Sequence, residues 1–93
     1  MKHVVIVVFG RVQGVYFRAT TKQQADKLGV SGWVRNRRNG TVEISATGSE
    51  EQLRSLISWC HEGSVYSEVT DVKVVWSDVP VATKSGFDIN PSF

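Results

Sequence analysis

The chain has 93 residues, 41% hydrophobic and 22% charged, which suits one small domain and excludes a disordered, collagen-like or low-complexity chain. Its single cysteine excludes an internal disulfide framework and a cysteine-based zinc site, so the expected domain, residues 1–93, depends on its hydrophobic core. The formal net charge is only +2, but the charges are unevenly distributed. Residues 1–40 carry eight basic side chains and one acidic one, whereas residues 41–93 carry three basic and eight acidic ones. We therefore expect the first half to bind an anion.

The pattern of apolar residues over positions 1–29 predicts a strand and a helix joined by a glycine-rich loop. Residues 3–9 form a β-branched apolar run that ends at Gly10, as is typical of a strand buried on both faces or near the centre of a sheet. Residues 17–28 change to a helical period with one modest apolar face. Gly29 follows where a left-handed helix cap is expected.

A β-hairpin is predicted next. Asn39 and Gly40 lie between the strand-like residues 33–38 and 41–47. An Asn-Gly pair is the strongest short hairpin signal, because both central residues of a type I′ turn need a positive φ. A longer loop over residues 37–40 would shift the strand register by one residue and reverse which side chains face the core. The sequence leaves both turns open.

The remaining elements are a second helix and two strands. Ser49 and Gln52 fit a capping box before an apolar helical face, and Gly63 is the expected stop. Residues 69–76 alternate as a strand does, and residues 86–89 can add a short edge strand. The order β-α-β-β-α-β with a short C-terminal edge strand predicts an α+β fold. We expect a ferredoxin-like two-layer sandwich, with a mostly antiparallel sheet and two helices on one face.

The segment between the first strand and the first helix is the first candidate site. Gly10 and Gly14 allow a tight fold that presents backbone N–H groups, and the following helix adds its unpaired amides and the positive end of its dipole. Arg18 adds a planar cation matched to phosphate or carboxylate. The glycine spacing fits neither a nucleotide P-loop nor the dinucleotide fingerprint. The residues alone leave open an anion-binding loop or a tight surface loop with an exposed Arg.

Asn36 is the second candidate. It is expected on a strand beside Arg35, Arg37 and Arg38, and an amide that both donates and accepts can orient a nucleophilic water without titrating. The alternative is a polar residue before a turn, next to a solvated basic face.

Other reactive side chains form no obvious site. His3 and His61 are far apart in sequence and have no ligands at metal spacing, and Cys60 lies on an apolar helical face with no cationic neighbour to lower its pKa. We therefore expect no metal, no cofactor and an inert thiol.

Taken together, the two candidate segments resemble the acylphosphatase family. Residues 10–18 read G-R-V-Q-G-V-Y-F-R, similar to the family pattern G-x-V-Q-G-V-x-F-R. Residues 32–36 and 40–43 are similar to its second pattern, G-W-V-x-N followed by G-x-V-E. The chain departs from the family at Gly63-Ser64, where Gly-Pro is frequent, and in the polar residues 77–85, so local loop geometry is in question.

The resemblance implies hydrolysis of the carboxyl–phosphate bond of acyl phosphates, giving carboxylate and inorganic phosphate, without a metal, cofactor or covalent intermediate. It implies that Arg18 clamps the phosphoryl oxygens and that Asn36 positions the attacking water. Arg11 and Arg35 lie on or beside the motifs but receive no direct role. The implied phosphate-binding loop consists of the backbone amides of Gln13, Gly14, Val15, Tyr16, Phe17 and Arg18.

Two other functions remain open: a non-catalytic anion-binding module of the same fold, and nucleic-acid binding through Trp33 and its neighbouring arginines. The chain length and the initial Met favour the enzyme over the module. Residues 41–47 hold no aromatic side chain, which argues against an RNA-recognition domain. No stretch approaches the roughly 20 apolar residues of a membrane-spanning helix. We expect a monomeric, cytoplasmic hydrolase of a small acyl phosphate, with no nucleic-acid or membrane partner.

Overall fold

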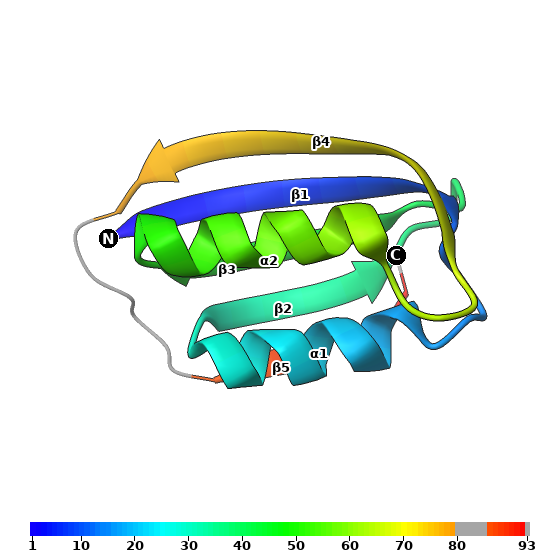
Figure 1. Ribbon diagram of the computed structural model, residues 1–93, viewed down its shortest axis with the longest axis horizontal. Helices are drawn as coiled ribbons and strands as arrows, with labels where there is room; N and C mark the ends of the chain where they lie inside the picture. Colours follow the sequence, from blue (N-terminus) through cyan, green and yellow to red (C-terminus); the bar gives the residue numbers. More distant parts are fainter. Residues whose placement is uncertain (80–85, 93) are drawn as a thin grey trace.

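The computed structural model describes residues 1–79 and 86–92, and the predicted order of elements is confirmed (Figure 1). Residues 80–85 and 93, which include part of the polar approach to the last strand, lie outside the described residues. The elements are β1 Lys2–Arg11, α1 Phe17–Leu28, β2 Ser31–Asn36, β3 Val42–Gly48, α2 Glu50–Glu62, β4 Glu68–Asp78 and β5 Phe87–Ile89.

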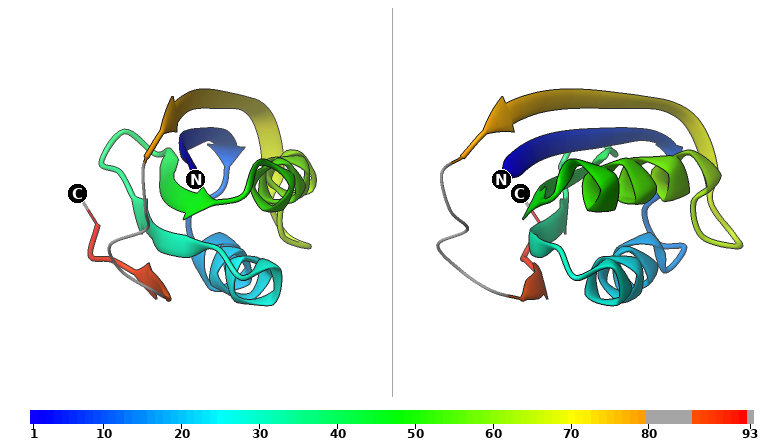
Figure 2. Two further views of the ribbon diagram at one scale, coloured as in Figure 1. Left: turned by 90° about the vertical axis from the view of Figure 1, so that its left-hand side faces the viewer. Right: turned by 60° about the vertical axis from the view of Figure 1, so that its left-hand side comes forward.

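The strands form one sheet in the order β4-β1-β3-β2-β5. Every neighbouring pair is antiparallel except β2 and β5, which run parallel. Both helices lie on the same face of the sheet (Figure 2). The expected α+β two-layer sandwich is therefore confirmed, and its loops β1–α1, β2–β3 and α2–β4 lie at one end of the molecule (Figure 1).

The core lies between the sheet and the two helices. On β1, alternate residues Val4, Ile6 and Val8 are fully buried, as a strand with one face against helices requires. The strand lies at the centre of the sheet, between β4 and β3, so its apolar run reflects a central position rather than full burial of both faces. Phe17 packs against Trp59 at a centroid distance of 5.2 Å and joins the start of α1 to α2.

Gly10 continues β1 instead of ending it. The pairing with β4 shifts between Phe9 and Gly10, and the strand runs on to Arg11. At Gly10 φ is +123°, and a Cβ there would overlap the carbonyl oxygen of Glu68 on β4. The glycine therefore permits a bulge with close backbone approach. Consequently the loop before α1 is shorter than the sequence motif suggests.

The β2–β3 turn is the longer loop over residues 37–40, not the two-residue turn at Asn39 and Gly40. Asn36 pairs with Val42, the amide of Arg37 donates to the carbonyl of Thr41 at 2.9 Å, and the amide of Gly40 donates to Arg37 at 3.1 Å. Among the described residues other than glycine, only Tyr16 has a positive φ, which excludes a type I′ turn at Asn39. In this register Asn36 shares the core-facing side of β2 with the buried Val34.

Candidate active site

The loop before α1 has two left-handed residues, and its amides have no acceptor among the described residues. Gly14 has φ +71°, and Tyr16, the N-cap of α1, has φ 62° and ψ 19° with no side-chain capping bond. In the described part of the chain, none of the amides of residues 13–19 donates a hydrogen bond to another protein group. The first helical bond runs from the amide of Thr20 to the carbonyl of Tyr16 at 3.0 Å. These amides therefore lie at the positive end of the helix dipole, where an anion binds favourably.

Two side chains connect this loop to other parts of the chain. The side-chain amide of Gln13 donates to the carbonyls of Arg37 and Thr41 at 2.7 and 2.9 Å. The hydroxyl of Ser64, after α2, donates to the carbonyl of Val15 at 3.0 Å. The sequence placed Gln13 in the loop but gave its side chain no role, and it marked Ser64 only as a departure from the family pattern. Local loop geometry is thus defined by contacts with two other loops.

Asn36 contributes a buried oxygen at the end of β2. Its Oδ1 is buried and has no hydrogen-bond partner among the described protein groups. A buried carbonyl oxygen without a donor costs about 1–3 kcal/mol, so such an atom is suited to accept a hydrogen bond from a bound water or ligand.

A pocket of about 380 Å³ brings Asn36 and Arg18 together at the start of α1. Arg18 is half-buried, and no residue in the described ranges forms an ion pair or hydrogen bond with its guanidinium. An unpaired guanidinium beside free amides can bind a phosphoryl group through two oxygens. The complete lining is Val12, Gly14, Tyr16, Phe17, Arg18, Ala19, Asn36 and Ile89.

The lining agrees only in part with the residues chosen from the sequence. Gln13 and Val15 belong to the loop but do not line the pocket. Val12, Ala19 and Ile89 do line it and were not chosen. Of these, Val12 and Ala19 flank the chosen segment and could have been found by extending it. Ile89 lies on the short strand β5 beside Val34, and no local signal connects it with the motifs.

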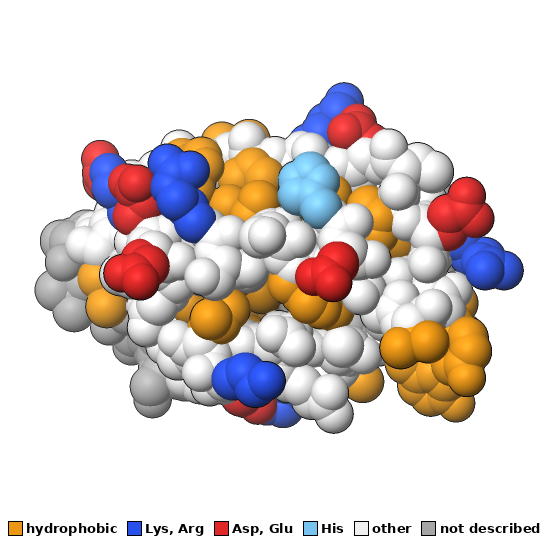
Figure 3. Space-filling model, in the orientation of Figure 1, with side chains coloured by type: hydrophobic (Ala, Val, Ile, Leu, Met, Phe, Trp, Pro, Cys, Tyr) orange, Lys and Arg blue, Asp and Glu red, His pale blue; other side chains and the backbone are white. Residues whose placement is uncertain are grey.

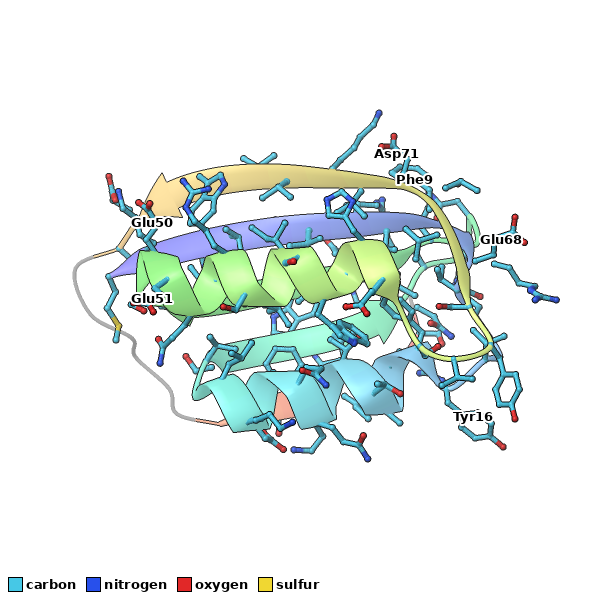
Figure 4. The ribbon with its side chains drawn as sticks, viewed as in Figure 1. Phe9, Tyr16, Glu50, Glu51, Glu68 and Asp71 are labelled. Carbon is cyan, nitrogen blue, oxygen red and sulfur yellow. The ribbon has the colours of Figure 1, made fainter. Side chains whose placement is uncertain are left out.

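Exposed apolar side chains lie at the same end of the molecule. Tyr16 is 75% exposed and extends away from the start of α1 (Figure 4). Val65 and Tyr66, which follow Ser64, are also exposed. Hydrophobic side chains gather at this corner of the molecular surface (Figure 3).

Arg35 does not belong to the pocket. It lies on the opposite side of β2 from Asn36, where it binds Glu43 at 2.7 Å and covers the ring of Trp33 at 4.7 Å. None of Arg35, Arg37 and Arg38, the basic residues beside Asn36 in the sequence, lines the pocket that contains it. Arg11, at the end of β1, donates to the carbonyl of Tyr66 at 3.3 Å.

The remaining reactive side chains have structural surroundings. Burial raises the pKa of the Cys60 thiol to about 12, which keeps it protonated. The ring of His3 makes hydrogen bonds with the hydroxyls of Thr47 and Ser45 at 2.8 and 3.1 Å. Within residues 1–79 and 86–92, no three His, Cys, Asp or Glu side chains are grouped to hold a metal ion. No helix in these ranges is long and apolar enough to cross a membrane.

Comparison with known proteins gives consistent matches. The family model described as acylphosphatase matches residues 4–89. The acylphosphatase of Pelotomaculum thermopropionicum is 49% identical over 84 residues, which cover 90% of each chain. The crystal structure of acylphosphatase from Bacillus subtilis superposes with a TM-score of 0.92 and 42% identity, covering 97% of this chain and 99% of that one. An acylphosphatase from Coxiella burnetii gives a TM-score of 0.85 and 32% identity, covering 96% and 92%.

Proposed function

Since the chain belongs to the acylphosphatase family, whose members are hydrolases of acyl phosphates, we propose that it cleaves the carboxyl–phosphate bond with backbone amides, Arg18 and Asn36, and without a metal ion. The observation that carries this proposal is that the buried Oδ1 of Asn36 and the guanidinium of Arg18 share one pocket, and that neither has a partner within residues 1–79 and 86–92. The oxygen of Asn36 can accept a hydrogen bond from water and the guanidinium of Arg18 can bind phosphate, and hydrolysis of a phosphate compound requires both.

The phosphoryl group binds at the start of α1. The free amides of the loop donate to its non-bridging oxygens, and the guanidinium of Arg18 donates to two of them. The side chain of Gln13 is bonded to Arg37 and Thr41, and that of Val15 is apolar, so these two residues can contribute only their backbone amides. Because these donors are fixed by the fold, they stabilise developing charge on the phosphoryl oxygens without reorganising.

Asn36 positions the attacking water. Its Oδ1 accepts a hydrogen bond from the water, whose oxygen forms a bond to phosphorus while the bond from phosphorus to the carboxyl oxygen breaks. The carboxylate leaves with the bonding electron pair. No Asp, Glu or His is among the pocket-lining residues, and we propose that a phosphoryl oxygen accepts the proton that the water loses. Carboxylate is a good leaving group, so positioning and charge stabilisation can supply most of the catalysis.

Hydrolysis of a simple aryl acyl phosphate tests the proposal. We expect the wild type to turn over equally with and without chelator. Arg18→Ala should lose about 10²–10³-fold or more in kcat/KM, with weaker phosphate inhibition. Asn36→Ala should lose about 10²-fold in kcat with little change in KM, because it removes orientation of the water rather than phosphate binding. Arg38→Ala, at an exposed position of the β2–β3 turn, is the matched control for loss of one positive charge.

Three results would contradict the proposal. Chelator-sensitive turnover would contradict a metal-independent reaction. An inactive wild type that still binds phosphate would favour a binding module. A pH–rate profile that depends on a side chain titrating near neutrality, and that loses this dependence on its mutation, would contradict proton transfer to phosphate.

We also propose that residues 1–93 act as a single domain and as a cytoplasmic monomer without nucleic acid. The buried thiol of Cys60 is compatible with a reducing compartment. The pairing of Arg35 with Glu43 weakens the basic face that a nucleic acid would need. Light scattering, cell fractionation and salt-dependent oligonucleotide binding test these points.

A further inference from the structure

We propose that Ser64 is a positioning residue of the phosphate-binding loop, one that holds the amide of Tyr16 toward the phosphoryl group. This inference rests on the proposed function, since it concerns the same site. Ser64 is 8% exposed, and its hydroxyl donates to the carbonyl oxygen of Val15 at 3.0 Å. It does not line the pocket, so any effect on phosphate must pass through the loop.

The effect passes through one peptide group. The carbonyl of Val15 and the N–H of Tyr16 belong to the same planar trans peptide and point in opposite directions. A hydrogen bond that fixes the carbonyl on one side therefore fixes the direction of the N–H on the other. Tyr16 lines the pocket, and its amide is among those that donate to no described protein group. The bond from Ser64 thus selects the orientation in which this amide remains available to the anion.

This orientation needs support, because the backbone at Tyr16 is unfavourable. A φ of 62° at a residue other than glycine costs about 1–2 kcal/mol. Rotation of the peptide between Val15 and Tyr16 would bring φ of Tyr16 out of the left-handed region and would also turn the N–H away from the pocket. The hydrogen bond from Ser64 opposes that rotation, because the carbonyl of Val15 would lose its donor.

Ser64 is itself firmly placed. Its carbonyl oxygen accepts from the amide and the hydroxyl of Ser67 at 3.0 and 2.7 Å. The preceding Gly63 ends α2, with its amide bonded to Trp59 at 2.8 Å, and a Cβ at Gly63 would collide with the hydroxyl of Ser67. A proline in place of Ser64 would have no hydroxyl to donate. The departure from the family pattern at this position therefore adds a contact to the phosphate-binding loop.

The test uses inorganic phosphate as the probe and three variants at one position. Ser64→Ala removes the donor, Ser64→Cys keeps nearly the same volume with a weak donor, and Ser64→Thr keeps the hydroxyl. We expect the phosphate dissociation constant to rise about fivefold in Ser64→Ala, to rise in Ser64→Cys, and to stay within about twofold in Ser64→Thr. In amide NMR spectra, the shift of the Tyr16 N–H on phosphate saturation should shrink in Ser64→Ala.

Ser55→Ala, at an exposed position of α2, is the matched control, because it removes a hydroxyl without touching Ser64 or the phosphate-binding loop. It should leave the phosphate affinity and the Tyr16 amide shift unchanged. The inference is overturned if folded Ser64→Ala or Ser64→Cys binds phosphate as the wild type does, or if folded Ser64→Thr binds as poorly as Ser64→Ala. Failure of the proposed function is a different result: a wild type that neither hydrolyses acyl phosphate nor binds phosphate.

Discussion

The side chain of Gln13 donates a hydrogen bond of 2.9 Å to the carbonyl oxygen of Thr41, across 28 positions of the sequence. The same nitrogen also donates to Arg37 at 2.7 Å. The phosphate-binding loop is thereby joined to the β2–β3 turn, which begins directly after Asn36. The two parts of the site that we propose to bind phosphate and water are therefore joined by one side chain that does not line the pocket.

Gln13→Ala should lower the free energy of unfolding by about 1–2 kcal/mol, because two carbonyl oxygens lose their donor. Gln13→Glu should lower the free energy of unfolding further at neutral pH, since a carboxylate would face the same two carbonyl oxygens. At low pH the protonated acid can donate a hydrogen bond, so this variant should recover part of the lost stability. Urea unfolding across pH measures both effects. Equal stability of the Ala and Glu variants at neutral pH would show that these hydrogen bonds contribute little.

The local parts of the fold could be read from the sequence, and the long-range parts of the site could not. The bounds of α1 follow from its helical period and from Gly29, which has the expected left-handed backbone at φ 78°. The capping box of Ser49 and Gln52 is likewise present. Each of these features is decided by residues within one or two helical turns, which is the range over which sequence patterns carry information.

The type of the β2–β3 turn could not be predicted from its neighbouring residues. Asn39-Gly40 is compatible with both turn types, and in the longer loop the side chain of Asn39 gains hydrogen bonds that stabilise it. Its Oδ1 accepts hydrogen bonds from the amide and the hydroxyl of Thr41, at 3.1 and 2.6 Å. The contacts of Gln13 and Ser64 are harder still to foresee, because side chain–backbone bonds between distant loops leave no periodic pattern. Arg18 and Asn36, the side chains predicted to act on phosphate and water, do line the pocket, but the contacts that hold the surrounding loops were not predicted.

Arg18→Lys separates charge from geometry at the phosphate site. Lysine keeps the positive charge but cannot donate through a planar fork, so we expect kcat/KM to fall about 10- to 100-fold, less than in Arg18→Ala. Steady-state kinetics and phosphate inhibition measure the loss, with Arg38→Lys as the control at an exposed position. Full activity in Arg18→Lys would mean that a single point charge is sufficient.

Tyr16→Gly should raise the free energy of unfolding by about 0.5–1 kcal/mol. Glycine removes the left-handed strain at φ 62°, and this gain exceeds the added entropy of the unfolded chain. Little burial is lost, because Tyr16 is 75% exposed. Gly14→Ala is the reverse experiment, since φ is +71° with no atom within 4 Å of an added Cβ, and it should destabilise by about 1 kcal/mol through strain alone. A loss of stability in Tyr16→Gly would indicate that the ring contributes packing that outweighs the strain.

Cys60 should make stability depend on pH in the alkaline range. Burial raises its pKa in the folded protein to about 12, against 9.0 for an exposed thiol. As pH rises above 9, the unfolded chain loses this proton first, while the folded protein keeps it. The unfolded state is then favoured, so the contribution of Cys60 to stability is complete below pH 9 and declines from there toward pH 12.

Comparison of the wild type with Cys60→Ala isolates this effect, because other groups that titrate in the same range are present in both proteins. The variant should be less stable at neutral pH, since it leaves a cavity beside α2. Above pH 9, however, the difference between the two proteins should shrink, by up to about 1.4 kcal/mol for each pH unit. Urea unfolding between pH 8 and about 10.5 measures it. A difference that stays constant over this range would mean that the thiol ionises in the folded protein as easily as in the unfolded chain.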